Sequence, residues 1–117
     1  MPNRESAAEI CPVETTLAVI GGKWKPVILW RLSEGALRSA QLKAAIPGIT
    51  QRVFTHQLRE LEADGVIARE VVAGAPPAVT YRLTVLGESL GPVLAVMSDW
   101  GKAHPDLGRA TSDASSK

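Results

Sequence analysis

One stretch, "GITQRVFTHQLRELEADG", constrains the fold more than any other, because its apolar residues fall at the spacing of a single helix face. Phe54, Leu58 and Leu61 form that apolar stripe. Thr50 stands in the N-cap position and Gly65 follows the last turn. The stripe must pack against a core, so the polar face of the same helix is expected in solvent.

The segments around this helix predict a compact motif. Downstream, "VIAREVV" and "AVTYRLT" alternate apolar and polar residues on either side of "AGAPPA", which predicts a hairpin with a proline-stiffened loop. Upstream, "LRSAQLKAAIPG" predicts a short helix closed by Pro47 and Gly48, with Leu42, Ala45 and Ile46 facing inward. Two helices joined through "IPGIT" and followed by a hairpin make a helix-turn-helix with a wing.

Two further helices are expected before this motif. "CPVE" predicts a helix start, with Cys11 as N-cap and a proline at the first helical position, and the glycines at 21–22 end that helix. A second helix begins near Lys23, accommodates Pro26 in its first turn and ends before Gly35.

A last helix is predicted near the C-terminus. Its apolar residues are spaced 4, 3, 4 and 3 apart, which is the heptad pattern of a helix that pairs with another helix. Pro92 is expected to kink this helix. The seam begins at Leu86, and the predicted dimer interface consists of Leu90, Val93, Met97 and Trp100.

The predicted fold class is therefore α+β, mostly α: a winged helix-turn-helix with an N-terminal helix and a C-terminal dimerisation helix. A chain of 117 residues supports one domain, which we place at 11–103. Residues 1–10 and 104–117 are polar or punctuated by Pro and Gly, and we expect them to be flexible ends.

The charge of the chain is concentrated in one segment. The total is only +1, yet residues 20–59 contain seven basic residues and one acidic residue, a net charge of +6. A neutral protein with one basic segment is a candidate for docking a polyanion through that segment.

The polar face of the first-described helix carries residue types that read DNA bases. Arg pairs with guanine, Gln with adenine, and Thr contacts base edges or the thymine methyl group, while a helix N-terminus favours phosphate. A merely solvated face is the alternative, which the neighbouring elements and the charge disfavour. The predicted DNA contacts on this helix are Thr50, Gln51, Arg52, Thr55, His56 and Arg59.

Phosphate contacts are expected from five residues that precede this helix in the chain. Simple solvation is the alternative for each of them. The wing loop has no basic residue, and its strands carry only Arg69 and Arg82, so we expect the wing to contribute shape or little at all. The five residues are Lys23, Lys25, Arg38, Ser39 and Gln41.

Two interpretations of Cys11 stay open. A thiol at a helix N-terminus feels the helix dipole and is activated toward oxidants and electrophiles, although Glu9 and Glu14 oppose this effect. The other interpretation is a small apolar residue at an interface. The three tryptophans are interpreted as core or interface packing rather than as a platform for single strands.

Other classes of protein are disfavoured. Cys11, His56 and His104 have no metal-binding spacing, and we expect neither a metal site nor a cofactor. No acid–base pair follows from spacing, so an enzyme is not expected. No apolar run approaches the roughly 20 residues of a membrane span, and no signal peptide is apparent. We therefore expect a cytoplasmic protein without a membrane partner.

Three segments, "CPVETTLAVIGGKWKPVILWRL", "PGITQRVFTHQLRELEADGVIARE" and "PPAVTYRLTVLGESLGPVLAVMSDWG", closely resemble the HxlR-type winged helix-turn-helix transcriptional regulators of bacteria over residues 10–101. The resemblance implies a homodimer, formed by the N- and C-terminal helices, that binds a pseudo-palindromic operator. Some members sense quinones, aldehydes or oxidants through the cysteine that corresponds to Cys11, and others carry it without any demonstrated sensing. The start of the recognition helix fits the family, whereas His56 is an unusual residue that would tune the operator sequence.

The predicted function is a dimeric, sequence-specific regulator of transcription that binds double-stranded DNA, with Cys11 as a candidate redox or electrophile sensor. Two alternatives remain: a winged-helix module for protein–protein contact, and a regulator that responds to a non-covalent small-molecule effector bound between the dimer helices.

Overall fold

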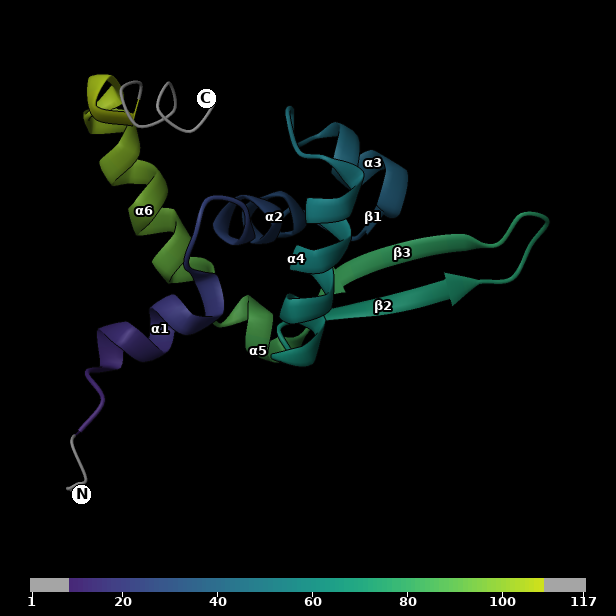
Figure 1. Cartoon of the computed structure of the whole chain (residues 1–117), viewed down its shortest axis with the longest axis horizontal. Helices are drawn as coiled ribbons and strands as arrows, with labels where there is room; N and C mark the ends of the chain where they lie inside the picture. The colour runs from purple at the N-terminus through teal and green to yellow at the C-terminus, as the bar shows by residue number, and fades with distance from the viewer. Residues whose placement is uncertain (1–8, 109–117) are drawn as a thin grey trace.

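The computed structural model describes residues 9–108, so most of the two predicted flexible ends, 1–8 and 109–117, lie outside the described residues. The predicted fold class is confirmed: helices dominate, and a small antiparallel sheet accompanies them (Figure 1). The elements in chain order are α1 (Pro12–Ile20), α2 (Lys25–Leu32), β1 (Leu37–Arg38), α3 (Ser39–Ala44), α4 (Gln51–Ala63), β2 (Ile67–Val72), β3 (Ala78–Leu83), α5 (Val85–Glu88) and α6 (Gly91–Ala103).

Helix α4 matches the sequence expectation at both ends. The Thr50 hydroxyl accepts a hydrogen bond from the Val53 backbone N–H at 3.2 Å, as an N-cap residue does. Gly65 follows the helix with a φ of 79°, a conformation that a residue without Cβ adopts at little cost. Both features depend on residues within one turn, which explains why the sequence revealed them.

The core is built around the apolar face of α4. Phe54, Leu58 and Leu61 are buried and pack in one cluster with Ile28 and Leu29 of α2. Full burial of side chains of this size contributes about 1.5–3 kcal/mol each. The cluster holds α4 against α2 and the sheet, and this packing settles which face of α4 remains exposed.

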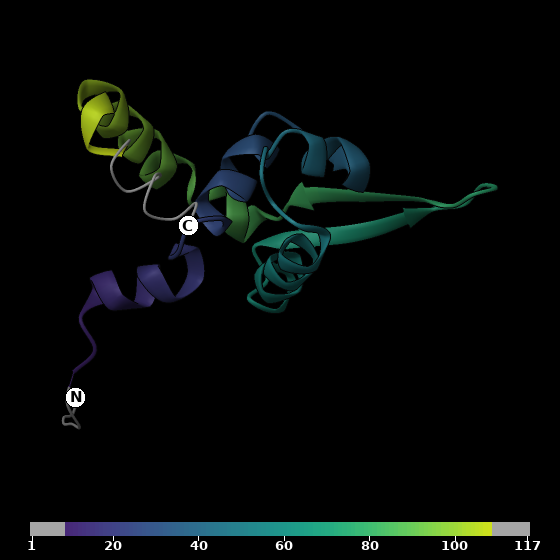
Figure 2. The same ribbon diagram turned by 45° about the horizontal axis from the view of Figure 1, so that its top comes forward.

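The sheet has the strand order β1-β3-β2, with both pairs antiparallel. The hairpin of β2 and β3 was expected, and its tip extends away from the helices (Figures 1 and 2). Strand β1 was not expected, because Leu37 and Arg38 were assigned to a helix. They instead pair with Tyr81 and Thr80, and α3 begins only at Ser39.

The prediction of a single kinked helix near the C-terminus is wrong. Two helices are present: α5 ends at Glu88, and Pro92 lies in the first turn of α6, where its missing N–H needs no partner. Leu86 therefore lies on α5, outside the seam that continues along α6. The side chain of α6 that enters the core is Leu94.

Helices α1 and α6 diverge from the rest of the fold on the side opposite the wing tip (Figures 1 and 2). The Cys11 backbone N–H donates to Glu14 Oε1 at 3.1 Å, which confirms the predicted start of α1. After α6, residues 105–108 form one more helical turn. The ring of His104 stacks on the ring of Trp100, with their centroids 4.2 Å apart. The two diverging helices form an open V in both views (Figures 1 and 2).

Candidate nucleic-acid interface

The polar face of α4 lies opposite its buried stripe. Gln51, Arg52, His56 and Arg59 are exposed, and Thr55 is half-buried. The Gln51 side-chain amide donates to Thr55 Oγ1 at 3.0 Å, which orients two neighbouring side chains on the same face. These five residues border one surface depression of about 610 Å³ along the helix. The fold thus brings most of the predicted contacts of α4 onto one surface.

A groove of about 540 Å³ connects α4 with the start of α3 and with the wing. Arg38, Ser39 and Lys43 form its α3 side, and Gln51 forms its α4 side. The prolines at 76–77 close it from the wing loop. The uncharged wing tip thus forms one side of the groove and basic residues form the other. Such a groove is suited to bind a phosphate backbone.

Gln41 has a structural task at the start of α3. The Arg38 backbone N–H donates to Gln41 Oε1 at 3.0 Å, a bond that satisfies a helix N-terminus. The amide oxygen of Gln41 is therefore engaged, and its NH₂ group is the part left for a phosphate.

The strands of the wing place one arginine beside α4. Arg69 of β2 borders a depression of about 360 Å³ together with Thr55 and Arg59. Arg82, by contrast, lies 3.3 Å from Glu70 in an ion pair across the hairpin. Arg69 thus adds a cation to the α4 surface, a contribution that the wing was not expected to make.

The two lysines before α2 differ in their surroundings. Lys23 is exposed, and its ammonium lies 4.7 Å from the centre of the Trp24 ring. Lys25 Nζ lies 2.8 Å from Glu60 Oε1 of α4, and its side chain is only 13% exposed. Lys25 is therefore not a free cation for phosphate, and the prediction made for it is corrected.

Glu60 has a second partner on its own helix. Its Oε2 atom lies 3.2 Å from His56 Nε2, one turn earlier in α4. The hydrogen bond from Lys25 and the nearby positive charges hold the pKa of Glu60 below its ordinary value of 4.5. The carboxylate thus links α2, α4 and one candidate base-reading side chain.

The two diverging helices expose apolar side chains. On α6, Val93, Met97 and Trp100 are exposed, whereas Leu90, just before the helix, is half-buried against the core. On and before α1, the exposed apolar residues are Ile10, Val13 and Leu17. An isolated protomer gains nothing from apolar surface left in water, so these faces are candidates for contact with another chain.

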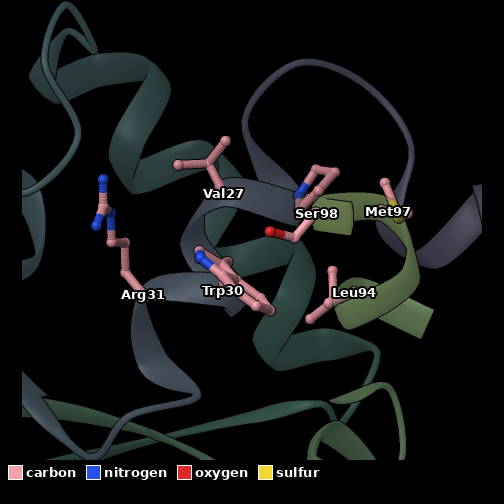
Figure 3. Close-up of a pocket in the computed structure, with 7 residues that line it drawn as sticks. Val27, Trp30, Arg31, Leu94, Met97 and Ser98 are labelled. Atoms are coloured by element: carbon pink, nitrogen blue, oxygen red, sulfur yellow. The ribbon is translucent and has the colours of Figure 1, made fainter. Parts of the chain in front are cut away.

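A pocket of about 320 Å³ lies between α2 and α6. Figure 3 shows Val27 and Trp30 of α2 facing Leu94 and Met97 of α6, with the Ser98 hydroxyl group directed into the same space. Trp30 and Trp100 are both exposed, so neither belongs to the protomer core, whereas Trp24 packs against it.

Some candidate residues were missed from sequence. Lys43 and Arg69 line the same depressions as the predicted contacts. The basic segment contained Lys43, which was the available signal, whereas Arg69 gave none because its neighbour Arg59 lies ten residues away in the chain.

The described residues contain no helix long and apolar enough to cross a membrane. Residues 9–108 also contain no cluster of three or more His, Cys, Asp or Glu side chains arranged to hold a metal ion.

A helix-turn-helix of α3 and α4 beside a β2–β3 wing defines the winged helix-turn-helix class. Residues 19–108 match the family described as HxlR-like helix-turn-helix. The chain belongs to this family, and the resemblance seen in its sequence is confirmed.

The relatives are regulators of transcription by name. The chain is 53% identical over 98 residues to YdeP of Bacillus subtilis (strain 168), described as an uncharacterized HTH-type transcriptional regulator, and the match covers 84% of this chain and 77% of YdeP.

Solved structures show the same fold. The redox regulator HypR in its reduced form superposes with a TM-score of 0.79 at 45% identity, covering 86% of this chain and 99% of HypR. The reduced form of YodB from B. subtilis gives a TM-score of 0.70 at 30% identity, covering 82% and 95%.

Proposed function

We propose that this chain is a homodimeric regulator of transcription that binds double-stranded DNA through the exposed face of α4. The observation that carries the proposal is the single surface formed by Gln51, Arg52, His56 and Arg59. Its residue types suit the major groove, where Arg and Gln distinguish bases. The groove between α3 and the wing would receive the adjacent phosphates.

The exposed apolar faces of α1 and α6 support a dimer of this regulator. A second copy that covers Val93, Met97 and Trp100 would remove them from water, at about 25 cal/mol for each Å² buried. A two-fold dimer presents two α4 helices to two half-sites about 34–36 Å apart, or a multiple of that distance. The predicted operator is therefore pseudo-palindromic.

Binding to the DNA upstream of the protein's own gene, followed by fluorescence anisotropy, tests this function. The expected result is tight binding that weakens steeply with added salt and exceeds binding to scrambled DNA of the same length. Absence of any preference for that DNA, followed by failure to enrich sequences from a random pool, would overturn the proposal.

Cys11 is the proposed sensing residue of this regulator. The thiol is exposed at the start of α1, one of the two helices that form the proposed dimer. The sequence contains one cysteine, so a disulfide can form only with another molecule, as an intersubunit or a mixed disulfide, whereas an electrophile would form an adduct with the thiol. Solved relatives include the redox regulator HypR in its oxidized form and the diamide-treated YodB of B. subtilis.

The sensing proposal is tested by adding a thiol oxidant to the DNA-binding measurement. Loss or gain of binding in the wild type, reversed by a reductant and absent in Cys11→Ser, would support a cysteine switch. Binding that ignores the oxidant would leave Cys11 with its structural role at the N-cap of α1.

A second candidate function is a response to a small molecule that binds without a covalent bond. The pocket between α2 and α6 favours it, because about 320 Å³ is at the lower end of ligand-sized cavities and Trp30 offers an aromatic wall. Quenching of tryptophan fluorescence by a ligand panel, compared with Trp30→Phe, would reveal such a site.

The remaining alternative is a winged-helix module for protein–protein contact. The net charge of +6 in residues 20–59 argues against it, because a protein partner provides no general reason for such a charge. The relatives of this chain are named as regulators rather than as enzymes. We therefore propose a regulator without catalytic activity that acts in the cytoplasm.

A further inference from the structure

Glu60 lies in the C-terminal half of α4, one turn after His56. Its two carboxylate oxygens serve different partners. Oε1 binds the Lys25 ammonium of α2 at 2.8 Å, and Oε2 lies 3.2 Å from Nε2 of His56. The side chain of His56 is 65% exposed on the same surface as Gln51 and Arg52.

Lys25 anchors the carboxylate from outside α4. Its side chain is 13% exposed, so its ammonium has little freedom, and one carboxylate oxygen is held beside it. The other oxygen is thereby held toward His56. A carboxylate on an unanchored helix face would instead sample several rotamers.

The bound carboxylate selects one form of the imidazole. Glu60 is ionised at neutral pH, since its ordinary pKa of 4.5 already lies well below 7 and the Lys25 hydrogen bond lowers it further. An ionised carboxylate can only accept hydrogen bonds. Nε2 of His56 must therefore carry a hydrogen. Nδ1 is then the ring nitrogen left for a base edge, and in a neutral imidazole it is an acceptor.

We propose that Glu60 is a positioning residue for base readout, because it holds His56 in the form whose Nδ1 accepts a hydrogen bond from a base amino group. This inference rests on the proposed function, since it requires that α4 enter the major groove. The bases that offer an amino group there are adenine, through N6, and cytosine, through N4. Guanine offers only acceptors and is disfavoured at that position.

The charged groups around His56 are Glu60 and Lys25, together with Arg52 and Arg59 on α4. The two arginines are donors only, so they cannot substitute for Glu60 as the acceptor of the Nε2 hydrogen. The carboxylate is therefore the group to remove in a test.

The test is a selection from random DNA at about pH 8. The wild type is expected to prefer adenine or cytosine at one position of each half-site by about five-fold or more. Both His56→Ala and Glu60→Gln should abolish that preference, because an amide whose oxygen stays on Lys25 presents its NH₂ group, a donor, to Nε2 of His56. Glu60→Gln should also bind random DNA more tightly, because one negative charge near the phosphates is gone.

Two further variants separate positioning from general effects. The double variant His56→Ala, Glu60→Gln should show the same base profile as His56→Ala alone, because Glu60 acts only through His56. Glu62→Gln removes the same charge from the same helix, and it should raise binding to random DNA yet keep the preference. If Glu60→Gln does not fold, Lys25→Met removes the anchor and should weaken the same preference.

The outcomes of this selection test the role of Glu60 separately from the proposed DNA-binding function. A Glu60→Gln profile identical to that of the wild type, or a preference that survives in His56→Ala, would overturn the role of Glu60. Enrichment of no sequence at all by the wild type would overturn the proposed function instead.

Discussion

Lys25 and Glu60 join α2 to α4 through an ion pair in which the ammonium nitrogen and a carboxylate oxygen lie 2.8 Å apart. The two residues are 35 positions apart in the chain. This ion pair supplements the apolar packing between the two helices. It also leaves Lys25 unavailable as a free cation for DNA phosphates.

The pair predicts a pH dependence of stability. The pKa of Glu60 is lowered in the folded state, chiefly by the hydrogen bond from Lys25, so its ionised form favours folding. That contribution is complete above the ordinary value of 4.5 and disappears as the pH falls through the lower folded-state pKa. Urea unfolding of wild type and Glu60→Gln should therefore differ more at neutral pH than in acid. A difference that stays constant down to acid pH would contradict this assignment.

Gly87 of α5 is expected to resist substitution. A Cβ atom at this position would collide with the Val66 carbonyl oxygen, which is backbone and cannot move aside easily. Gly87→Ala should destabilise the fold by about 1–3 kcal/mol. Gly101, within α6, has open space around it, and Gly101→Ala should instead stabilise by up to about 1 kcal/mol. Thermal unfolding of both variants measures the contrast, and equal effects would refute it.

Met97 is expected to lie in the dimer interface. A charge buried between two apolar helices is costly, so Met97→Asp should convert the dimer to a monomer in size-exclusion chromatography with light scattering. Operator affinity should fall by about 10²-fold or more, because the two half-sites are no longer bound together. Val71→Asp on the exposed wing strand introduces the same charge and should leave the dimer intact. A Met97→Asp protein that remains dimeric would exclude this face.

Arg52 is expected to read a base. Arg52→Ala should cost about 1–3 kcal/mol of operator binding and relax specificity at one position, as the loss of a bidentate contact does. Anisotropy titrations on operator and on random DNA measure both effects. An equal loss on the two DNAs would assign Arg52 to a phosphate.

Much of the fold follows from local sequence. The apolar stripe of α4, its cap at Thr50 and its end at Gly65 involve residues within a few positions of one another. The alternation in β2 and β3 is equally local. By contrast, Leu37 and Arg38 carry no strand pattern of their own. They become β1 only because Tyr81 and Thr80, more than forty residues later, offer hydrogen-bonding partners.

The amino-acid sequence by itself determined the amphipathic recognition helix, the hairpin behind it and the basic character of residues 20–59. Tertiary structure alone decided which of those charges remain free. Because α2 packs on α4, Lys25 forms an ion pair with Glu60 and is not free to bind phosphate. The hairpin places Arg69 beside Arg59, so a cation from outside the basic segment joins the α4 surface. The physical reason is that ion pairing depends on distance in space, which chain packing sets, whereas periodicity and capping depend on distance along the chain.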